Sequence, residues 1–146
     1  PQTWDADVKE IAAGGYLFYD STKPLPASKF REDINILGMP LTQICNRTYT
    51  DARQRQLFKN IIYVGALSAL LDMDPEAIKK LVAEQYRGKE ALLDSNIKAF
   101  DMGRDYAKSE FGCPIGLRVE ARDAIGDRIF IEGNSAAALG AVYGGA

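Results

Sequence analysis

Residues 14–21 read Gly14-Gly15-Tyr16-Leu17-Phe18-Tyr19-Asp20-Ser21, and this segment indicates the fold class. A short run of large apolar residues between turn residues is typical of a strand buried on both faces, as in a parallel sheet covered by helices. Upstream, Trp4, Val8 and Ile11 recur at helical spacing, so a helix leads into this strand. The pattern predicts an α/β fold whose chain opens on a helix feeding a central strand, and we expect that earlier strands precede it.

Downstream, the sequence predicts a second strand over residues 34–37 and a short helix over residues 41–47. It then predicts a long helix that reaches about residue 71. The apolar side chains of the long helix project in nearly all directions, which predicts a helix buried all round. Gly65 and Ala69, four residues apart, should let another backbone approach it closely.

The next helix should begin at Asp74-Pro75, because Asp is a good N-cap and Pro suits the first helical position. A third helix should end near residues 112–114. Residues 117–122 alternate apolar and polar, residues 128–132 are a further strand candidate, and a helix with Asn134 as its N-cap follows. We place a boundary near residues 112–127.

Composition excludes several classes of function. The 146 residues carry a formal net charge of −2, whereas nucleic-acid binders usually have a strong basic excess. The sequence contains no His, which removes Ser-His-Asp and Cys-His catalysis and imidazole metal ligation. Cys45 and Cys113 are too few for a common zinc or iron–sulfur site, so we expect two buried, reduced thiols. The longest apolar run, residues 61–71, is too short for a bilayer. We expect a soluble, cytoplasmic protein.

Local motifs name no catalytic residue and no metal ligand. Gly133-Asn134 before a helix offers free backbone N–H groups to an anion, but a plain helix cap explains the pair better. Asp20-Ser21 follows a strand, where α/β sheets often bind ligands, although a turn cap is again the simpler interpretation. Four polar side chains remain as candidate contacts for a phosphorylated ligand, with solvated surface charge as the alternative: Lys59, Asn60, Arg87 and Lys89.

Four segments resemble one enzyme family. Residues 59–71, residues 74–96 and residues 14–21 are similar to the γ domain of 2-oxoacid:ferredoxin oxidoreductases. Residues 131–141 resemble the opening of the family's α domain, which binds the pyrimidine of thiamine diphosphate. The resemblance implies a three-layer α/β/α γ domain over residues 1–115, with a mostly parallel or mixed sheet and N-terminally truncated. It also implies a linker over residues 116–127 and the first strand and helix of the α domain over residues 128–146.

The order γ then α resembles a fused subunit of a two-subunit enzyme. Such enzymes oxidatively decarboxylate a 2-oxoacid, such as 2-oxoglutarate or pyruvate, form an acyl-CoA, and pass electrons through iron–sulfur clusters to ferredoxin. The resemblance implies that the whole enzyme uses thiamine diphosphate with Mg, and has a β subunit and ferredoxin as partners in an oligomeric assembly. It implies no nucleic acid and no membrane, and this segment by itself should be non-catalytic and bind no cofactor. It also suggests that Lys59, Asn60, Arg87 and Lys89 help hold coenzyme A.

Two alternatives remain at this point. The chain could be a non-enzymatic α/β interaction domain that shares only architecture with the family. It could also be a fragment of a dinucleotide-binding dehydrogenase, which has only the turn at Gly133 in its favour.

Overall fold

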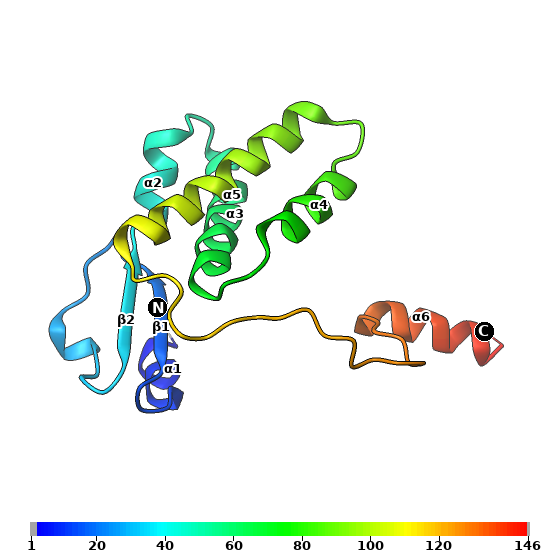
Figure 1. Cartoon of the computed structure of the whole chain (residues 1–146), viewed down its shortest axis with the longest axis horizontal. Helices are drawn as coiled ribbons and strands as arrows, with labels where there is room; N and C mark the ends of the chain where they lie inside the picture. The colour runs from blue at the N-terminus through cyan, green and yellow to red at the C-terminus, as the bar shows by residue number, and fades with distance from the viewer. Residues whose placement is uncertain (1–2, 146) are drawn as a thin grey trace.

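The structure is a computed structural model that describes residues 3–145. Figure 1 shows its elements in chain order. The strands are β1 (Tyr16–Asp20) and β2 (Asn35–Met39), and a single 3-10 turn, η1, covers Ala27–Lys29. The helices are α1 (Trp4–Glu10), α2 (Leu41–Thr48), α3 (Ala52–Leu70), α4 (Pro75–Gln85), α5 (Glu90–Glu110) and α6 (Gly133–Tyr143).

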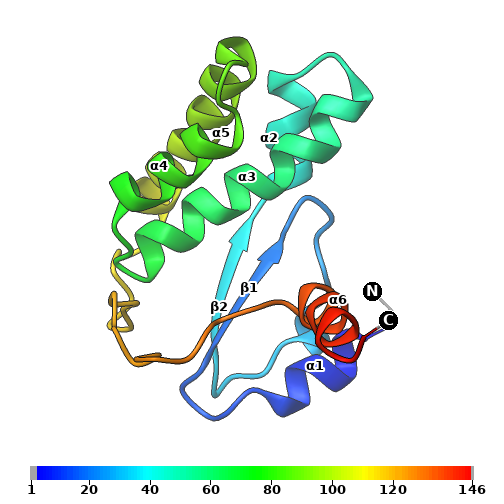
Figure 2. The same ribbon diagram turned by 90° about the vertical axis from the view of Figure 1, so that its right-hand side faces the viewer.

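The two strands are parallel, and helices lie on both of their faces. Phe18 pairs in register with Leu37, and both side chains pack against the core formed with α2, α3 and α5. Leu17 and Tyr19 point to the opposite face, where they pack with Trp4 of α1. Figure 2 shows α3 and α5 on one side of the strands and α1 on the other. The predicted α/β class with three layers and a parallel sheet is therefore confirmed.

The expectation that the first strand is buried on both faces is wrong in degree. Residues 17–20 are only half-buried, and Tyr16 is exposed. The reason is that β1 has a neighbouring strand, β2, along one edge, and the sheet described within residues 3–145 contains these two strands. The other edge of β1 therefore has no strand beside it within these residues.

The backbones of α3 and α5 approach each other closely where the two helices cross. A Cβ atom added at Gly65 would lie 2.0 Å from the carbonyl oxygen of Phe100. Reciprocally, a Cβ atom added at Gly103 would lie 1.9 Å from the carbonyl oxygen of Ile62. The predicted close approach at Gly65 is thus confirmed, and each helix supplies one glycine that lets the two backbones touch.

Burial of α3 on every side is not observed. The side chains of Phe58 and Ile62 are buried, but Leu57 is 57% exposed and Val64 is 40% exposed. The helix packs on α5 and on a sheet of two strands, so part of its apolar surface is uncovered within the described residues. The helix start at Asp74-Pro75 is confirmed, because the Asp74 carboxylate accepts a hydrogen bond from the Glu76 backbone N–H.

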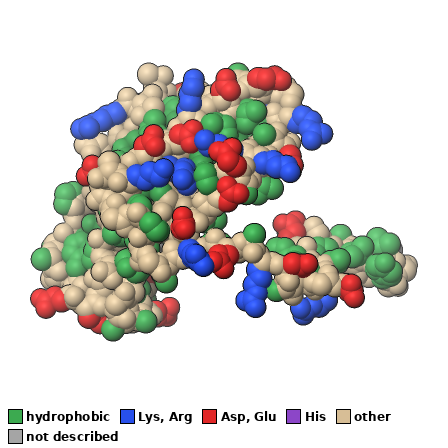
Figure 3. Space-filling model, in the orientation of Figure 1, with side chains coloured by type: hydrophobic (Ala, Val, Ile, Leu, Met, Phe, Trp, Pro, Cys, Tyr) green, Lys and Arg blue, Asp and Glu red, His purple; other side chains and the backbone are tan. Residues whose placement is uncertain are grey.

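The C-terminal part of the chain differs from the prediction. Backbone N–H groups of Ile115 and Val119 donate to the carbonyl oxygens of Leu70 and Leu71, and all residues from 116 to 145 are exposed. Residues 128–132 form no strand, because a strand needs a hydrogen-bonding neighbour and none lies beside them. The predicted N-cap is also wrong: α6 begins at Gly133, with Glu132 rather than Asn134 as its N-cap. In Figures 1 and 3, α6 stands apart from the rest and carries exposed apolar side chains.

Candidate functional site

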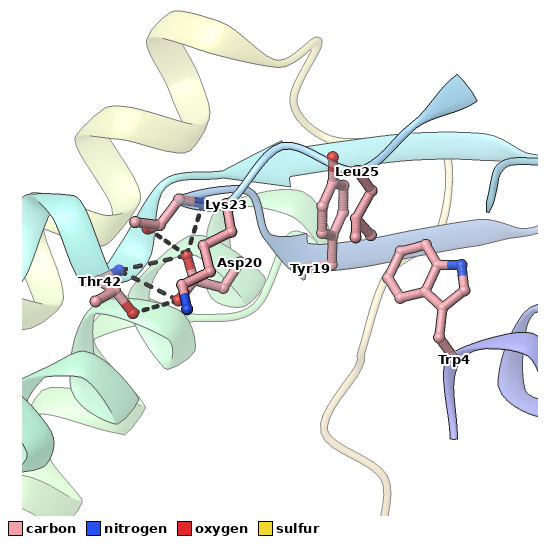
Figure 4. Close-up of a pocket in the computed structure, with 7 residues that line it drawn as sticks. Trp4, Tyr19, Asp20, Lys23, Leu25 and Thr42 are labelled. Atoms are coloured by element: carbon pink, nitrogen blue, oxygen red, sulfur yellow. Dashed lines mark hydrogen bonds between the residues drawn. The ribbon is translucent and has the colours of Figure 1, made fainter. Parts of the chain in front are cut away.

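A pocket of about 460 Å³ lies at the carboxyl end of β1, and we call it the Asp20 pocket. Ligands of parallel α/β sheets commonly bind at this end of the strands. Figure 4 shows an apolar wall and a polar end, which come from α1, β1, the following loop and the start of α2. The lining residues are Trp4, Tyr19, Asp20, Thr22, Lys23, Leu25 and Thr42.

The Asp20 carboxylate organises the polar end. It accepts hydrogen bonds from the Thr22 hydroxyl at 2.6 Å and from the Thr22 backbone N–H at 3.1 Å. It also accepts from the Thr42 hydroxyl at 2.5 Å and from the Thr42 backbone N–H at 3.3 Å. The Thr22 hydroxyl oxygen in turn accepts from the backbone N–H of Gln43 at 3.0 Å. One carboxylate therefore joins the end of β1, the following loop and the first turn of α2.

These contacts keep Asp20 ionised. Burial acts to raise the pKa of this carboxyl group, but the hydrogen bonds from Thr22 and Thr42 outweigh burial and hold the pKa below its ordinary value. The carboxylate also lies at the N-terminus of α2, where unpaired backbone N–H groups and the helix dipole favour a negative charge. The start of α2 is consequently already occupied by a side chain of the protein itself.

Lys23 supplies the positive charge of the pocket. Its side chain is exposed and runs beside Asp20 in Figure 4. Lys23 takes part in none of the ion pairs observed among residues 3–145. Its ammonium group is therefore available to an anionic ligand at the mouth of the pocket.

The apolar wall is held in a fixed orientation. Trp4 is only 8% exposed, and its indole Nε1–H donates to the Lys29 carbonyl oxygen at 2.8 Å. The indole meets the rings of Tyr19 and Phe30 edge to face, at centroid distances of 5.3 and 5.8 Å. A rigid aromatic wall beside a lysine suits a ligand that combines a planar or apolar part with a phosphate.

The residues singled out from the sequence occupy different places. Lys59 and Asn60 lie on α3, whereas Arg87 and Lys89 lie between α4 and α5, and none of the four lines the Asp20 pocket.

Asp20 is both a turn cap and a pocket residue. Sequence reasoning did not connect Trp4, Lys23 and Thr42, which come from three separate elements. The one local signal was the spacing of Asp20 and Thr22, which is typical of an Asx-type turn.

No metal or cluster site can be assembled from the described residues. Burial raises the pKa of both thiols; Cys45 is buried and Cys113 half-buried, and they form no disulfide. Residues 3–145 contain no group of three or more Cys, Asp or Glu side chains that could hold an ion. None of the helices in this part of the chain combines the length and apolar character of a bilayer span.

Comparisons with known proteins find relatives of this chain. The 2-oxoacid:ferredoxin oxidoreductase 2 subunit alpha of Aeropyrum pernix is 27% identical over 119 residues, covering 75% of this chain and 18% of that protein. The ketoisovalerate oxidoreductase subunit VorA of Methanothermobacter thermautotrophicus is 27% identical over 106 residues, covering 71% of this chain and 20% of that protein. The 2-oxoglutarate synthase subunit KorC of Archaeoglobus fulgidus is 32% identical over 72 residues, covering 49% of this chain and 36% of that protein. The matched part of the chain thus spans 18% to 36% of the length of these relatives.

A solved structure shares the fold. It is the 2-oxoglutarate:ferredoxin oxidoreductase from Magnetococcus marinus, with 2-oxoglutarate, coenzyme A and succinyl-CoA bound. The two superpose with a TM-score of 0.74 and 24% identity, over 99% of this chain and 25% of that one. The sequence profile described as pyruvate ferredoxin/flavodoxin oxidoreductase matches residues 1–106. The chain belongs to the pyruvate ferredoxin/flavodoxin oxidoreductase family.

Proposed function

We propose that this chain is part of a γ–α subunit of a 2-oxoacid:ferredoxin oxidoreductase. The observation that carries the proposal is the family match over residues 1–106, within a fold that superposes on the solved relative with a TM-score of 0.74. The reaction converts a 2-oxoacid, coenzyme A and two oxidised ferredoxins into an acyl-CoA, carbon dioxide, a proton and two reduced ferredoxins. Among 2-oxoacids we favour 2-oxoglutarate, because one relative is named a 2-oxoglutarate synthase subunit.

The division of the chain follows the same proposal. Residues 1–115 are the later part of the γ domain, residues 116–127 are a linker, and residues 128–146 open the α domain. Two observations support this division: the family match ends at residue 106, and the residues beyond Val119 make no backbone hydrogen bond to the α/β unit within the described chain. In this proposal the rest of the assembly, with a β subunit and ferredoxin, holds the thiamine diphosphate, magnesium and iron–sulfur clusters.

The contribution of this chain is to contact coenzyme A at the Asp20 pocket. Lys23 offers an ammonium group that suits a phosphate, and the Trp4–Tyr19 wall suits a planar base, because aromatic side chains stack on nucleobases. Lys59, Asn60, Arg87 and Lys89 remain a second proposed set, which the same experiment tests separately.

Calorimetric titration of the chain with coenzyme A tests the pocket. Lys23→Gln should weaken binding about 10- to 150-fold, which corresponds to the loss of one hydrogen bond between charged groups. Lys80→Gln is the matched control, because Lys80 is an exposed lysine on α4 that does not line the pocket. Equal losses in the two variants would remove Lys23 from the site, and a loss confined to Lys59 or Lys89 variants would move the site to those residues.

The family activity is tested on the assembled enzyme. With 2-oxoglutarate and coenzyme A it should reduce ferredoxin, and omission of coenzyme A should stop acyl-CoA formation. Pyruvate and 3-methyl-2-oxobutanoate serve as competing substrates. Failure to reduce ferredoxin with any of the three 2-oxoacids would favour an interaction domain over an enzyme segment.

A further inference from the structure

A second cavity, of about 270 Å³, lies between the ends of α3 and α5, and we call it the Arg104 cavity. It adjoins the segment after α5, where the Ile115 backbone N–H donates to the Leu70 carbonyl oxygen. The Tyr16 hydroxyl, at the start of β1, donates to the Ile115 carbonyl oxygen. The Arg104 cavity is therefore near the amino end of β1, whereas the Asp20 pocket is at its carboxyl end. Neither cavity shares a lining residue with the other.

Two cations of α5 face this cavity. Arg104 and Lys108 are four residues apart, so they project from the same side of the helix, and both line the cavity. Like charges at this spacing destabilise a helix. Neither takes part in an ion pair observed within residues 3–145. The Asp72 carboxylate also lines the cavity without pairing to them, so the three side chains sum to a formal charge of +1.

The guanidinium group of Arg104 is held in place by a buried hydroxyl. The Ser68 side chain is fully buried, and its oxygen accepts from Arg104 Nη1 at 2.9 Å. The same hydroxyl donates to the Gly65 carbonyl oxygen at 2.7 Å. The guanidinium carbon also lies 5.9 Å from the centre of the Phe100 ring. Arginine has five N–H donors, and the contact with Ser68 is the one hydrogen bond observed for this side chain in the described residues.

A thiol also lines the cavity. Cys113 lines it, and its thiol donates to the Ala107 carbonyl oxygen at 3.2 Å. Burial raises the pKa of the Cys113 thiol, while the charges of Lys108 and Arg104 both act to lower it. Arg104, Lys108 and Cys113 thus line one cavity.

We propose that the Arg104 cavity binds a phosphate group, with Arg104 and Lys108 as its ligands and Ser68 as the residue that orients Arg104. A planar guanidinium presents two parallel N–H donors to a phosphate, and a lysine adds a point charge. The small volume and the formal charge of +1 suit a single phosphate rather than a polyphosphate. The source is either free phosphate or a phosphomonoester, and this site is independent of the activity proposed above.

The test is an NMR titration of the ¹⁵N-labelled chain with inorganic phosphate at constant ionic strength. Saturable shifts should appear at the amides around residues 68–72 and 104–114. Lys108→Gln should weaken binding by about three- to tenfold. Arg104→Lys should weaken it by a similar factor, because lysine keeps the positive charge but lacks the two parallel N–H donors of the guanidinium. Lys98→Gln is the matched control, since it removes the same charge from the same helix outside the cavity.

Other results separate the sources and overturn the proposal. A parallel titration with adenosine 5′-monophosphate distinguishes a phosphomonoester from free phosphate, according to which ligand binds more tightly. If acetate binds as tightly as inorganic phosphate and adenosine 5′-monophosphate do, the site is not specific for phosphate and the proposal fails. If Lys108→Gln lowers the melting temperature but leaves phosphate binding unchanged, the two cations serve only to offset the negative ends of α3 and α5. Absence of any saturable shift would also overturn the proposal.

Discussion

Replacing Gly65 by alanine tests the packing on which the main core depends. The added methyl carbon would lie 2.0 Å from the Phe100 carbonyl oxygen and 2.9 Å from its carbonyl carbon. The obstacle is backbone, which cannot rotate away as a side chain can. To restore even a 3.0 Å contact, α3 and α5 must separate by about 1 Å, and a gap of this size forfeits about a quarter to a half of the dispersion energy of the atoms concerned.

The net cost follows from two opposing effects. Overpacking of a well-packed core costs about 1–3 kcal/mol, whereas alanine is favoured over glycine in a helix by about 1 kcal/mol. Because the clash here is between two backbones, we expect the upper part of the range and a net loss of about 1–2 kcal/mol in the free energy of unfolding. That loss corresponds to a fall of roughly 4–10 °C in melting temperature for a folded unit of this size.

Thermal and urea unfolding followed by circular dichroism measure this effect. The matched control is Gly112→Ala, because an added Cβ there meets no atom within 4 Å. The control should change the melting temperature by less than about 2 °C. If Gly65→Ala proves as stable as the parent chain, or more stable, then the two helices do not cross in contact and the packing described for them is wrong.

Three further predictions test the contacts of Asp20, the contact of Trp4 and the boundary near residues 112–127. Because the pKa of Asp20 is held below its ordinary value, its hydrogen bonds should contribute stability above about pH 4 that is lost as the pH falls through the lowered value. The stability difference between the parent and Asp20→Asn, from urea unfolding, should therefore shrink between pH 6 and pH 2; a constant difference would contradict this. Trp4→Phe should cost about 1–3 kcal/mol, because it leaves the Lys29 carbonyl oxygen without its indole donor; unchanged urea unfolding would show that this bond is not made. Deletion of residues 128–146 should leave the melting temperature of the α/β unit unchanged and reduce any self-association seen by light scattering. If the deletion instead unfolds the rest of the chain, the boundary near residues 112–127 is wrong and the chain is one integrated domain.

Local patterns predicted the elements whose structure depends on nearby residues. The start of α4 follows from Asp74 and Pro75, since both the cap and the restricted φ angle act within one turn. The strand after Gly15 follows from a short apolar run that is too brief for a helix. The close approach at Gly65 was also predictable, because a glycine in the middle of an apolar helix usually has a packing reason.

Features that depend on distant partners were not predictable from local patterns. Residues 129–131 are apolar and β-branched or aromatic, yet Phe130 is 91% exposed, because strand formation needs a neighbour that the described chain does not place there. The partner glycine of Gly65 is Gly103, 38 residues later, and nothing in the local sequence connects the two. The Asp20 pocket likewise joins Trp4, Lys23 and Thr42 from separate elements, so it exists only after the chain has folded.

The reciprocal contact of Gly65 and Gly103 also bears on how the protein opens. At this crossing the glycine of each helix lies against a backbone carbonyl oxygen of the other helix. Neither helix can therefore detach without disrupting the main core. The backbone amides near this crossing should exchange with solvent only when the whole α/β unit unfolds, whereas those of α6 can exchange by local fraying, because none of its residues is buried. The crossing therefore defines one cooperative folding unit, and α6 lies outside it.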